Sequence, residues 1–276
     1  MSELLCRSEN PMASSEKPMM SCNILHLLSG AKEARGLTVI IDVFRAFSVE
    51  CYMYEIGAKL VRPVGTIEEA WALHEAIPDS VLIGERKGIR CDGFDFGNSP
   101  SLITAAREKV EGRVAIHTTS AGTQGIVNAQ GASEILTGSL VNAKAVAQYI
   151  RMRAEERHSF LEFGEQAHEG TNAAAPLEVS LVAMGLGAER IAEEDELCAE
   201  YIRAYAEGKK IPPSFEQRRQ DLRNFDGKRF FNEELKEHFP REDYYMCIRE
   251  SAFPYVLRIR RDDLGYFSEK IDLPAE

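Results

Sequence analysis

Short apolar runs alternate with amphipathic stretches along the segment Leu37–Gly187, and this alternation is what most constrains the fold. It is typical of β-strand–helix–β-strand units, in which helices cover a largely parallel sheet. Strands are expected at residues 37–41, 59–63, 81–83, 113–117, 133–136 and 160–163. A Thr-x-x-Glu capping box at 66–69 begins one intervening helix, and the small apolar residues 177–186 favour a buried helix. The pattern predicts a three-layer α/β/α fold with a mostly parallel or mixed central sheet.

The composition changes beyond Glu189, where acidic and then mixed and aromatic residues follow the apolar segments. Helices are expected at 192–205, 216–224 and 232–238, and a last strand at 255–259. We expect residues 21–276 to form a single domain whose part 189–276 is mostly helical and packs on the rest, as a lid or as an edge. Residues 1–20 combine prolines, serines and charges without an apolar core, and are expected to form a disordered N-terminal arm.

The 276-residue chain carries a formal net charge of −11. A phosphate backbone repels an acidic surface, so we expect no nucleic-acid partner. No apolar stretch is long enough to cross a bilayer, and no membrane partner is expected. The six cysteines are scattered without a Cys-x-x-Cys pair, which argues against a zinc knuckle and indicates reduced thiols in a cytoplasmic protein. The sequence leaves the oligomeric state open, including a homo-oligomer.

Three groups of polar residues follow expected strands, and the first contains Asp42 and Arg45. At a spacing of three residues, both side chains would face the same side of a first helical turn. An acid at the carboxyl end of a strand is a natural Mg²⁺ ligand or phosphoryl acceptor, and a nearby arginine can hold a phosphate oxygen. The alternative is a helix-capping aspartate that also pairs with Arg45. These two residues alone are compatible with either interpretation.

The second group is the long polar loop 83–100, which holds four glycines. Glu85 and Asp95 offer hard oxygen ligands in this loop. Arg86 and Lys87 can bind anions, and mixed charges in a small space suit a metal ion together with a phosphate ester. The alternative is an ordinary solvated loop. Such a loop would not need glycines at this density, because glycine marks unusual backbone geometry.

The third group, residues 117–125, leaves an expected strand and enters a helix. Its hydroxyls and glycines can present N–H and O–H donors to an oxyanion, aided by the helix dipole. The alternative is an ordinary Ser/Thr helix cap. The segment matches neither the Walker A nor the GxGxxG pattern, and the chain has no GxSxG or HExxH motif. Its six histidines show no ligand spacing, so oxygen ligands and Mg²⁺ are favoured over a transition metal.

Three ordered motifs lie in these groups. They are Asp42-Val43-Phe44-Arg45-Ala46, Gly84-Glu85-Arg86 followed by Gly93-Phe94-Asp95-Phe96-Gly97-Asn98-Ser99-Pro100, and Thr118-Thr119-Ser120-Ala121-Gly122-Thr123. Together they resemble the motifs of the 2-phosphosulfolactate phosphatase family, over residues 37–187. The resemblance implies a Mg²⁺-dependent enzyme with a three-layer α/β/α fold. Such enzymes remove phosphate from a sulfonated phospholactate on the route to coenzyme M.

Three positions depart from the pattern of the family that the chain resembles. Phe47 stands where relatives usually carry a small hydroxyl residue, and Ala121 stands where many carry asparagine. Val179 follows Glu178 where a second acid would be expected. The resemblance implies retained phosphatase chemistry and leaves the natural ester open. The alternatives are a phosphatase for a different phosphorylated hydroxy acid and a non-catalytic anion-binding paralogue.

The resulting hypothesis is a Mg²⁺-dependent phosphomonoesterase for a small anionic substrate, in which charge neutralisation is the main catalytic effect. Catalytic roles are expected for Asp42, Arg45, Glu85 and Arg86, and metal coordination for Asp42, Glu85 and Asp95. Substrate contacts are expected from Lys87, Asn98, Ser99, Thr118, Thr119, Ser120, Gly122 and Thr123. Asp42 could be a covalent nucleophile or hold the metal that activates water. Because no acid stands two residues after it, metal-activated water is favoured.

Overall fold

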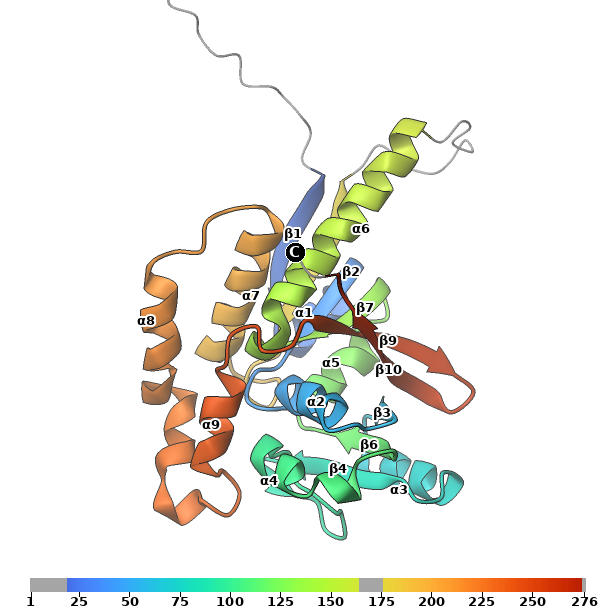
Figure 1. Ribbon diagram of the computed structural model, residues 1–276, viewed down its shortest axis with the longest axis vertical. Helices are drawn as coiled ribbons and strands as arrows, with labels where there is room; N and C mark the ends of the chain where they lie inside the picture. Colours follow the sequence, from blue (N-terminus) through green and yellow to red (C-terminus); the bar gives the residue numbers. More distant parts are fainter. Residues whose placement is uncertain (1–18, 164–175, 275–276) are drawn as a thin grey trace, which may run out of the picture.

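Ten strands form one mixed sheet at the centre of the computed structural model, which describes residues 19–163 and 176–274 (Figure 1). They lie side by side in the order β1-β8-β2-β7-β9-β10-β3-β6-β4-β5. In chain order they span Met20–His26 (β1), Gly36–Ile41 (β2), Leu60–Pro63 (β3), Val81–Arg86 (β4), Ile89–Arg90 (β5), Val114–Thr118 (β6), Ala132–Gly138 (β7), Leu177–Ala183 (β8), Tyr255–Asp262 (β9) and Gly265–Asp272 (β10). The predicted α/β class with a mixed sheet is confirmed.

Two parallel blocks flank an antiparallel hairpin in this sheet. One block comprises β1, β8, β2 and β7, and the other comprises β3, β6 and β4. The hairpin of β9 and β10 joins the blocks, because β9 pairs with β7, and β10 meets β3 where Ser268 lies opposite Val61. From the sequence, residues 189–276 are expected to pack as a lid or as an edge of the domain. The hairpin, which is part of this segment, instead lies in the middle of the sheet. Accordingly, the β9 residues Tyr255, Val256 and Leu257 are all buried.

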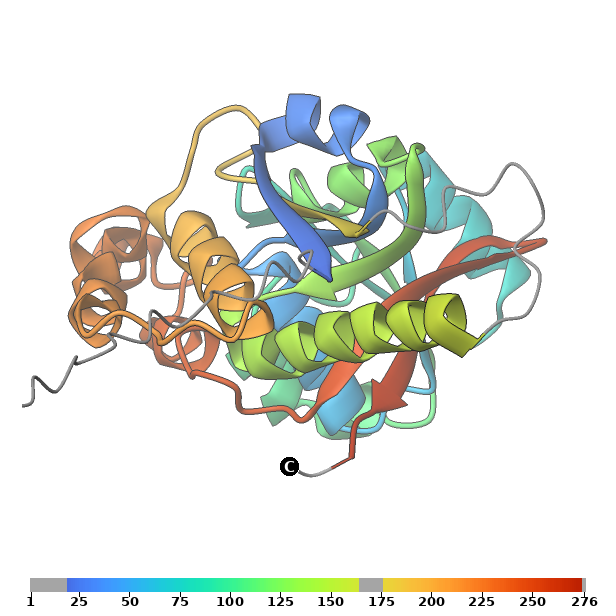
Figure 2. The ribbon, with the colours of Figure 1, turned by 90° about the horizontal axis from the view of Figure 1, so that it is seen from above.

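Helices cover both faces of the sheet and complete the three layers; Figure 2 shows α1 and α6 on opposite sides. On one face, Ile40 and Val182 pack against α1 and α5. On the other face, Val39 and Leu181 pack against α6 and α7, because successive strand residues point to opposite faces. The helices span Leu27–Glu33 (α1), Ala46–Glu55 (α2), Ile67–Ala76 (α3), Pro100–Ala105 (α4), Gly122–Asn128 (α5), Ala143–Phe163 (α6), Glu193–Ala206 (α7), Ser214–Asp221 (α8) and Arg241–Cys247 (α9). Within the described residues, none of the helices is long and apolar enough to cross a membrane.

Helix α2 is buried almost all round, over residues 46–53. Its Val49 and Met53 belong to a core cluster with β3, β4 and β6. Cys51 and Tyr52 on another side belong to a cluster with the hairpin strand β9. This packing fixes the start of α2 relative to the sheet, and with it the turn between β2 and α2.

Aromatic side chains join the C-terminal helices to that turn. The ring of Phe230, in the 3₁₀ helix Asp226–Phe231 (η4), lies with its centroid 5.1 Å from Phe44 and 5.7 Å from Phe239. Phe230, Phe239 and Tyr244 belong to the same core cluster as β2 and β8. The C-terminal helices therefore share the main hydrophobic core.

Three expected elements differ from the structure. Residues 232–238, expected as a helix, contain only the short 3₁₀ helix Glu233–Leu235 (η5). Residues 177–183 form β8 and not a helix: the strand pairs on both edges and is covered on both faces, and periodicity alone does not distinguish such an apolar run from a buried helix. Residues 160–163, expected as a strand, form the end of α6. The expected N-terminal arm lies outside the described residues up to position 18, and β1 already begins at Met20.

Candidate active site

Residues that follow the carboxyl ends of β2, β4 and β6 line a cavity of about 510 Å³. β4 and β6 are neighbours in one parallel block and β2 lies in the other, so residues from both blocks line the cavity. The predicted site residues that line it are Asp42, Arg45, Glu85, Lys87, Asn98 and Ser120. The rest of the lining includes Gly185, Leu186, Gly187, Glu189, Arg190, Arg229 and Phe239. All three predicted groups therefore contribute to one cavity.

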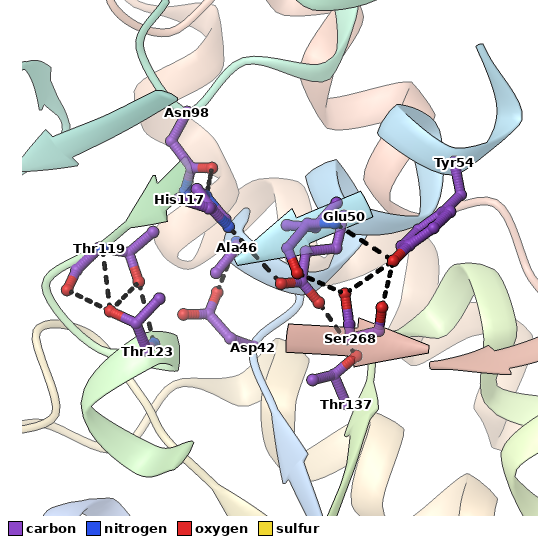
Figure 3. A network of polar contacts seen from close by, with 11 residues as sticks. Asp42, Ala46, Glu50, Tyr54, Asn98, His117, Thr119, Thr123, Thr137 and Ser268 are labelled. Carbon is purple, nitrogen blue, oxygen red and sulfur yellow. Dashed lines mark hydrogen bonds and ion pairs between the residues drawn. The ribbon is translucent and has the colours of Figure 1, made fainter. Parts of the chain in front are cut away.

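Asp42 lies in the turn that leads from β2 into α2. Its Oδ1 accepts a hydrogen bond from Ala46 N at 3.0 Å (Figure 3). The side chain is 7% exposed, and this burial raises its pKa to about 6. The nearby charge of Glu85 also raises the pKa, whereas the bond from Ala46 lowers it. Asp42 therefore caps the turn and also lines the cavity, so a capping role and a role in the site are compatible.

Glu85 stands near the end of β4, and donors from two loops hold its carboxylate. Oε1 accepts a hydrogen bond from Ser120 N at 2.8 Å, and Oε2 accepts one from Gly88 N at 2.5 Å. Ser120 Oγ donates to Oε2 at 3.1 Å and accepts from Lys87 N at the same distance. One carboxylate thus ties the loop after β4 to the loop after β6.

Arg45 pairs with the C-terminal helices and not with Asp42. Its Nη1 donates to Asp243 Oδ2 at 2.7 Å and to the carbonyl oxygen of His238 at 2.9 Å. Its guanidinium lies 4.7 Å from the ring centre of Phe239. The predicted pairing of Asp42 with Arg45 is therefore wrong, and Arg45 instead anchors α9 beside the cavity.

A half-buried arginine, Arg229, also lines the cavity, from η4. Its Nη2 donates to the carbonyl oxygen of Phe44 at 3.1 Å. Burial lowers the pKa of Arg229 from its ordinary value, and the charge of Glu194 opposes this. No motif marks Arg229 and it lies far along the chain from the three polar groups, so its sequence position does not predict a place in the site.

Two buried acids at the start of α7 are also missed. Asp195 Oδ1 accepts from Val43 N and its Oδ2 accepts from Gly185 N, both at 2.8 Å. Glu194 Oε2 is buried without a hydrogen-bond partner in the described part of the chain. Burial raises the pKa of Glu194 to about 7, and the charge of Arg229 opposes the rise. Four successive acids at 193–196 are the signal in the sequence, which an ordinary acidic first turn also explains.

Arg86 and Asp95 are not among the residues that line the cavity. Arg86 donates to the carbonyl oxygen of Glu85 at 2.7 Å and to Thr118 Oγ1 at 3.0 Å. Asp95 Oδ2 accepts from Leu82 N at 2.9 Å, near the start of β4 and not at its end. In the structure both side chains hold the loop; the catalytic role expected for Arg86 and the metal role expected for Asp95 stay predictions.

The other predicted substrate-binding residues also do not line the cavity: Ser99, Thr118, Thr119, Gly122 and Thr123. Ser99 caps α4 and donates to Asp243 Oδ1 at 2.9 Å. Thr119 N donates to Thr123 Oγ1 at 3.0 Å, and Thr123 N donates to Thr119 Oγ1 at 3.2 Å (Figure 3). A Cβ added to Gly122 would lie 2.8 Å from Ala46 Cβ. These residues shape the turn that presents Ser120.

The few carboxylates at the cavity suit a hard cation that takes only one or two protein ligands. Among the described residues, no group of three or more His, Cys, Asp or Glu side chains is placed to hold a metal ion. Mg²⁺ commonly takes one or two protein carboxylates and completes its shell with water and substrate phosphate. Asp42 and Glu85 fit that requirement, because both line the cavity and their charges repel each other. Of the three expected ligands, these two line the cavity, and metal binding itself stays a prediction.

The family model described as 2-phosphosulpholactate phosphatase matches residues 22–262. The chain belongs to this family. A probable 2-phosphosulfolactate phosphatase of Bacillus subtilis is 28% identical over 226 residues, which are 82% of this chain and 88% of the relative. A protein of the same name from Clostridium acetobutylicum is 44% identical over 113 residues, 41% of this chain and 47% of the relative. The relative from Carboxydothermus hydrogenoformans is 36% identical over 132 residues, 48% and 54% of the two chains.

The three residues that depart from the family pattern, Phe47, Ala121 and Val179, lie at different distances from the cavity. Ala121 lines the cavity. Phe47 is fully buried and packs in the core cluster beneath α1 and α5. Val179 pairs with Cys22 and Leu37 in the first half of β8, whereas the cavity lies beyond the carboxyl ends of the parallel strands. Val179 therefore gives no reason to expect a lost metal ligand.

Proposed function

We propose that the protein is a Mg²⁺-dependent phosphatase that hydrolyses 2-phosphosulfolactate to sulfolactate and phosphate. The observation that carries the proposal is the shared cavity, which is lined by the acids Asp42 and Glu85 together with the cations Lys87 and Arg229. Membership of the family supports the choice of substrate, since the relatives carry that name.

The cavity suits a small and strongly anionic ester. A volume of about 510 Å³ lies within the usual range for small-molecule sites. The phosphate, carboxylate and sulfonate groups of the substrate need several cationic or N–H donors. Lys87 and Arg190 extend the positive charge to the rim, although Arg190 also pairs with Asp226 at 2.6 Å.

The residues that line the cavity would have different chemical roles. Asp42 and Glu85 would hold Mg²⁺, which activates water and neutralises phosphoryl oxygens. Arg229 and Lys87 stabilise negative charge that develops on the phosphoryl group, and their effect is strengthened where Phe44 and Phe239 exclude water. The residue two positions after Asp42 is Phe44, so no second acid assists a covalent route.

Phosphate release tests the proposal directly. The protein is expected to prefer 2-phosphosulfolactate over 2-phospholactate and 3-phosphoglycerate, to lose activity in EDTA and to regain it with Mg²⁺. Asp42→Asn should abolish turnover, whereas the control Asp263→Asn, in the exposed β9–β10 turn, should not. Full activity after thorough chelation would exclude the metal mechanism, and full activity of Asp42→Asn would remove that residue from it.

Two alternatives give different outcomes in the same assay. A phosphatase for another phosphorylated hydroxy acid would prefer a different member of the panel. A non-catalytic anion-binding paralogue would be thermally stabilised by the esters without consuming them.

We also propose a cytoplasmic protein on the route to coenzyme M. The five described cysteines are free thiols and four of them are buried, as suits a reducing compartment. A homo-oligomer remains a prediction, which light scattering of the purified protein would test.

A further inference from the structure

A buried histidine, His117, lies on β6 beside Asn98 (Figure 3). His117 begins the third polar group. Its side chain has no exposed surface and does not line the cavity. Its Nε2 lies 3.1 Å from Oδ1 of Asn98. Asn98 itself lines the cavity. The ring therefore contacts the site through one side chain without touching the cavity.

The other side of the ring faces a buried acid. His117 Nδ1 lies 3.8 Å from Glu50 Oε1, and both side chains are fully buried. Glu50 Oε2 accepts a bond from Thr137 Oγ1 at 3.3 Å. Within the described residues, Nδ1 and Oε1 have no hydrogen-bond partner. At 3.8 Å the two atoms are too far apart for a hydrogen bond, so the buried Glu50 carboxylate lies beside the Nδ1 side of the ring without bonding it.

The contact with Asn98 determines the role of the other ring nitrogen. An amide oxygen only accepts hydrogen bonds, so His117 Nε2 is the donor and Asn98 Oδ1 is its acceptor.

We propose that His117 is a positioning residue whose Nε2–H anchors Asn98 Oδ1, so that the Asn98 amide nitrogen is the atom presented to an anionic ester. In the described part of the chain no hydrogen bond occupies that nitrogen. An amide without the anchor could present its oxygen instead, which an anion repels. The inference rests on the proposed function and adds a reason why a buried histidine contacts Asn98.

A pair of amide substitutions tests the anchor. His117→Gln places an N–H donor near the position of Nε2, whereas the shorter side chain of His117→Asn ends near the position of Nδ1. The KM for the phosphate ester should rise roughly tenfold to a hundredfold in His117→Asn, with a much smaller change in kcat. In His117→Gln it should stay within about threefold of the wild-type value. Equal KM values in the two variants would overturn the proposal.

A double-mutant cycle separates positioning from a merely structural role. In an Asn98→Ala background, His117→Asn should raise KM no further, because the amide that it orients is gone. Independent, additive effects would contradict the proposal. A purely structural role would lower the melting temperature and leave KM unchanged.

Asn98→Asp keeps the inference testable if the histidine variants do not fold. The aspartate retains an oxygen for His117 and turns a second oxygen toward the ester, so KM should rise at least about tenfold. An unchanged KM would refute the orientation. If the wild-type protein releases no phosphate from any ester, the proposed function fails. The orientation is then tested by inorganic phosphate, which should stabilise the wild type against heat but not Asn98→Asp.

Discussion

Replacing Asp243 by asparagine should lower the free energy of unfolding by about 3 kcal/mol. The Arg45–Asp243 pair joins α2 to α9 at 2.7 Å, and its side chains are 3% and 0% exposed. Asparagine keeps the shape and can still accept the bond from Ser99, but it leaves the guanidinium buried without a counter-charge. Loss of one partner from a buried pair costs about 3–5 kcal/mol. We expect the lower end, because Arg45 keeps the His238 carbonyl and the Phe239 ring.

Urea unfolding followed by circular dichroism measures this loss, which corresponds to a fall in Tm of roughly 6–12 °C for a chain of this size. The matched control is Glu111→Gln, which breaks the Arg107–Glu111 pair. That pair has the same 2.7 Å separation, but its side chains are 58% and 52% exposed. The control should lose less than about 0.5 kcal/mol. If Asp243→Asn lowers the free energy of unfolding no more than the control does, then burial does not determine how much these ion pairs contribute to stability, and the reasoning is refuted.

Two further changes probe the core around the cavity. Burial raises the pKa of Glu194 from 4.5 to about 7, so its contribution to stability is fully present below pH 4.5 and is lost as the pH rises through about 7. Glu194→Gln should therefore show a smaller fall in Tm than the wild type across that window, and identical falls would contradict this. Gly125→Ala should cost about 1–3 kcal/mol, since its Cβ would lie 2.5 Å from Ile40 Cγ2 and 2.7 Å from Met184 Sδ. Gly65→Ala, with 3.4 Å to its nearest neighbour, should be nearly neutral, and the urea midpoints of the two variants compare them.

Local sequence signals predict the parallel units of the fold and fail where pairing is non-local. Strands such as 37–41 and 113–117 are short apolar runs bounded by polar turns, so they are identified from their neighbours alone. The strand β8 is not predicted because burial on both faces removes the alternation of apolar and polar residues that marks a strand. The strand β10 has a polar sequence around Ser268 and is stabilised by its pairing with β9, which no local pattern reveals.

The site shows the same division between local and tertiary information. Asp42 and Glu85 are predicted because each comes at the carboxyl end of an identifiable strand. The loop position of Asp95 does not reveal that its carboxylate accepts a hydrogen bond from the backbone N–H of Leu82. Arg229 and Glu194 reach the cavity region through the packing of the C-terminal helices, which spacing along the chain does not encode.

The central hairpin also determines when a growing chain can complete its sheet (Figure 1). Residues 255–272 emerge from the ribosome after every other strand described here has been made. Until then β7 and β3 are unpaired edges of two separate blocks, and exposed edges invite pairing between chains. Asp42 follows β2 in one block and Glu85 lies on β4 in the other. A nascent chain released before residue 255 should therefore yield two aggregation-prone halves and not a smaller enzyme.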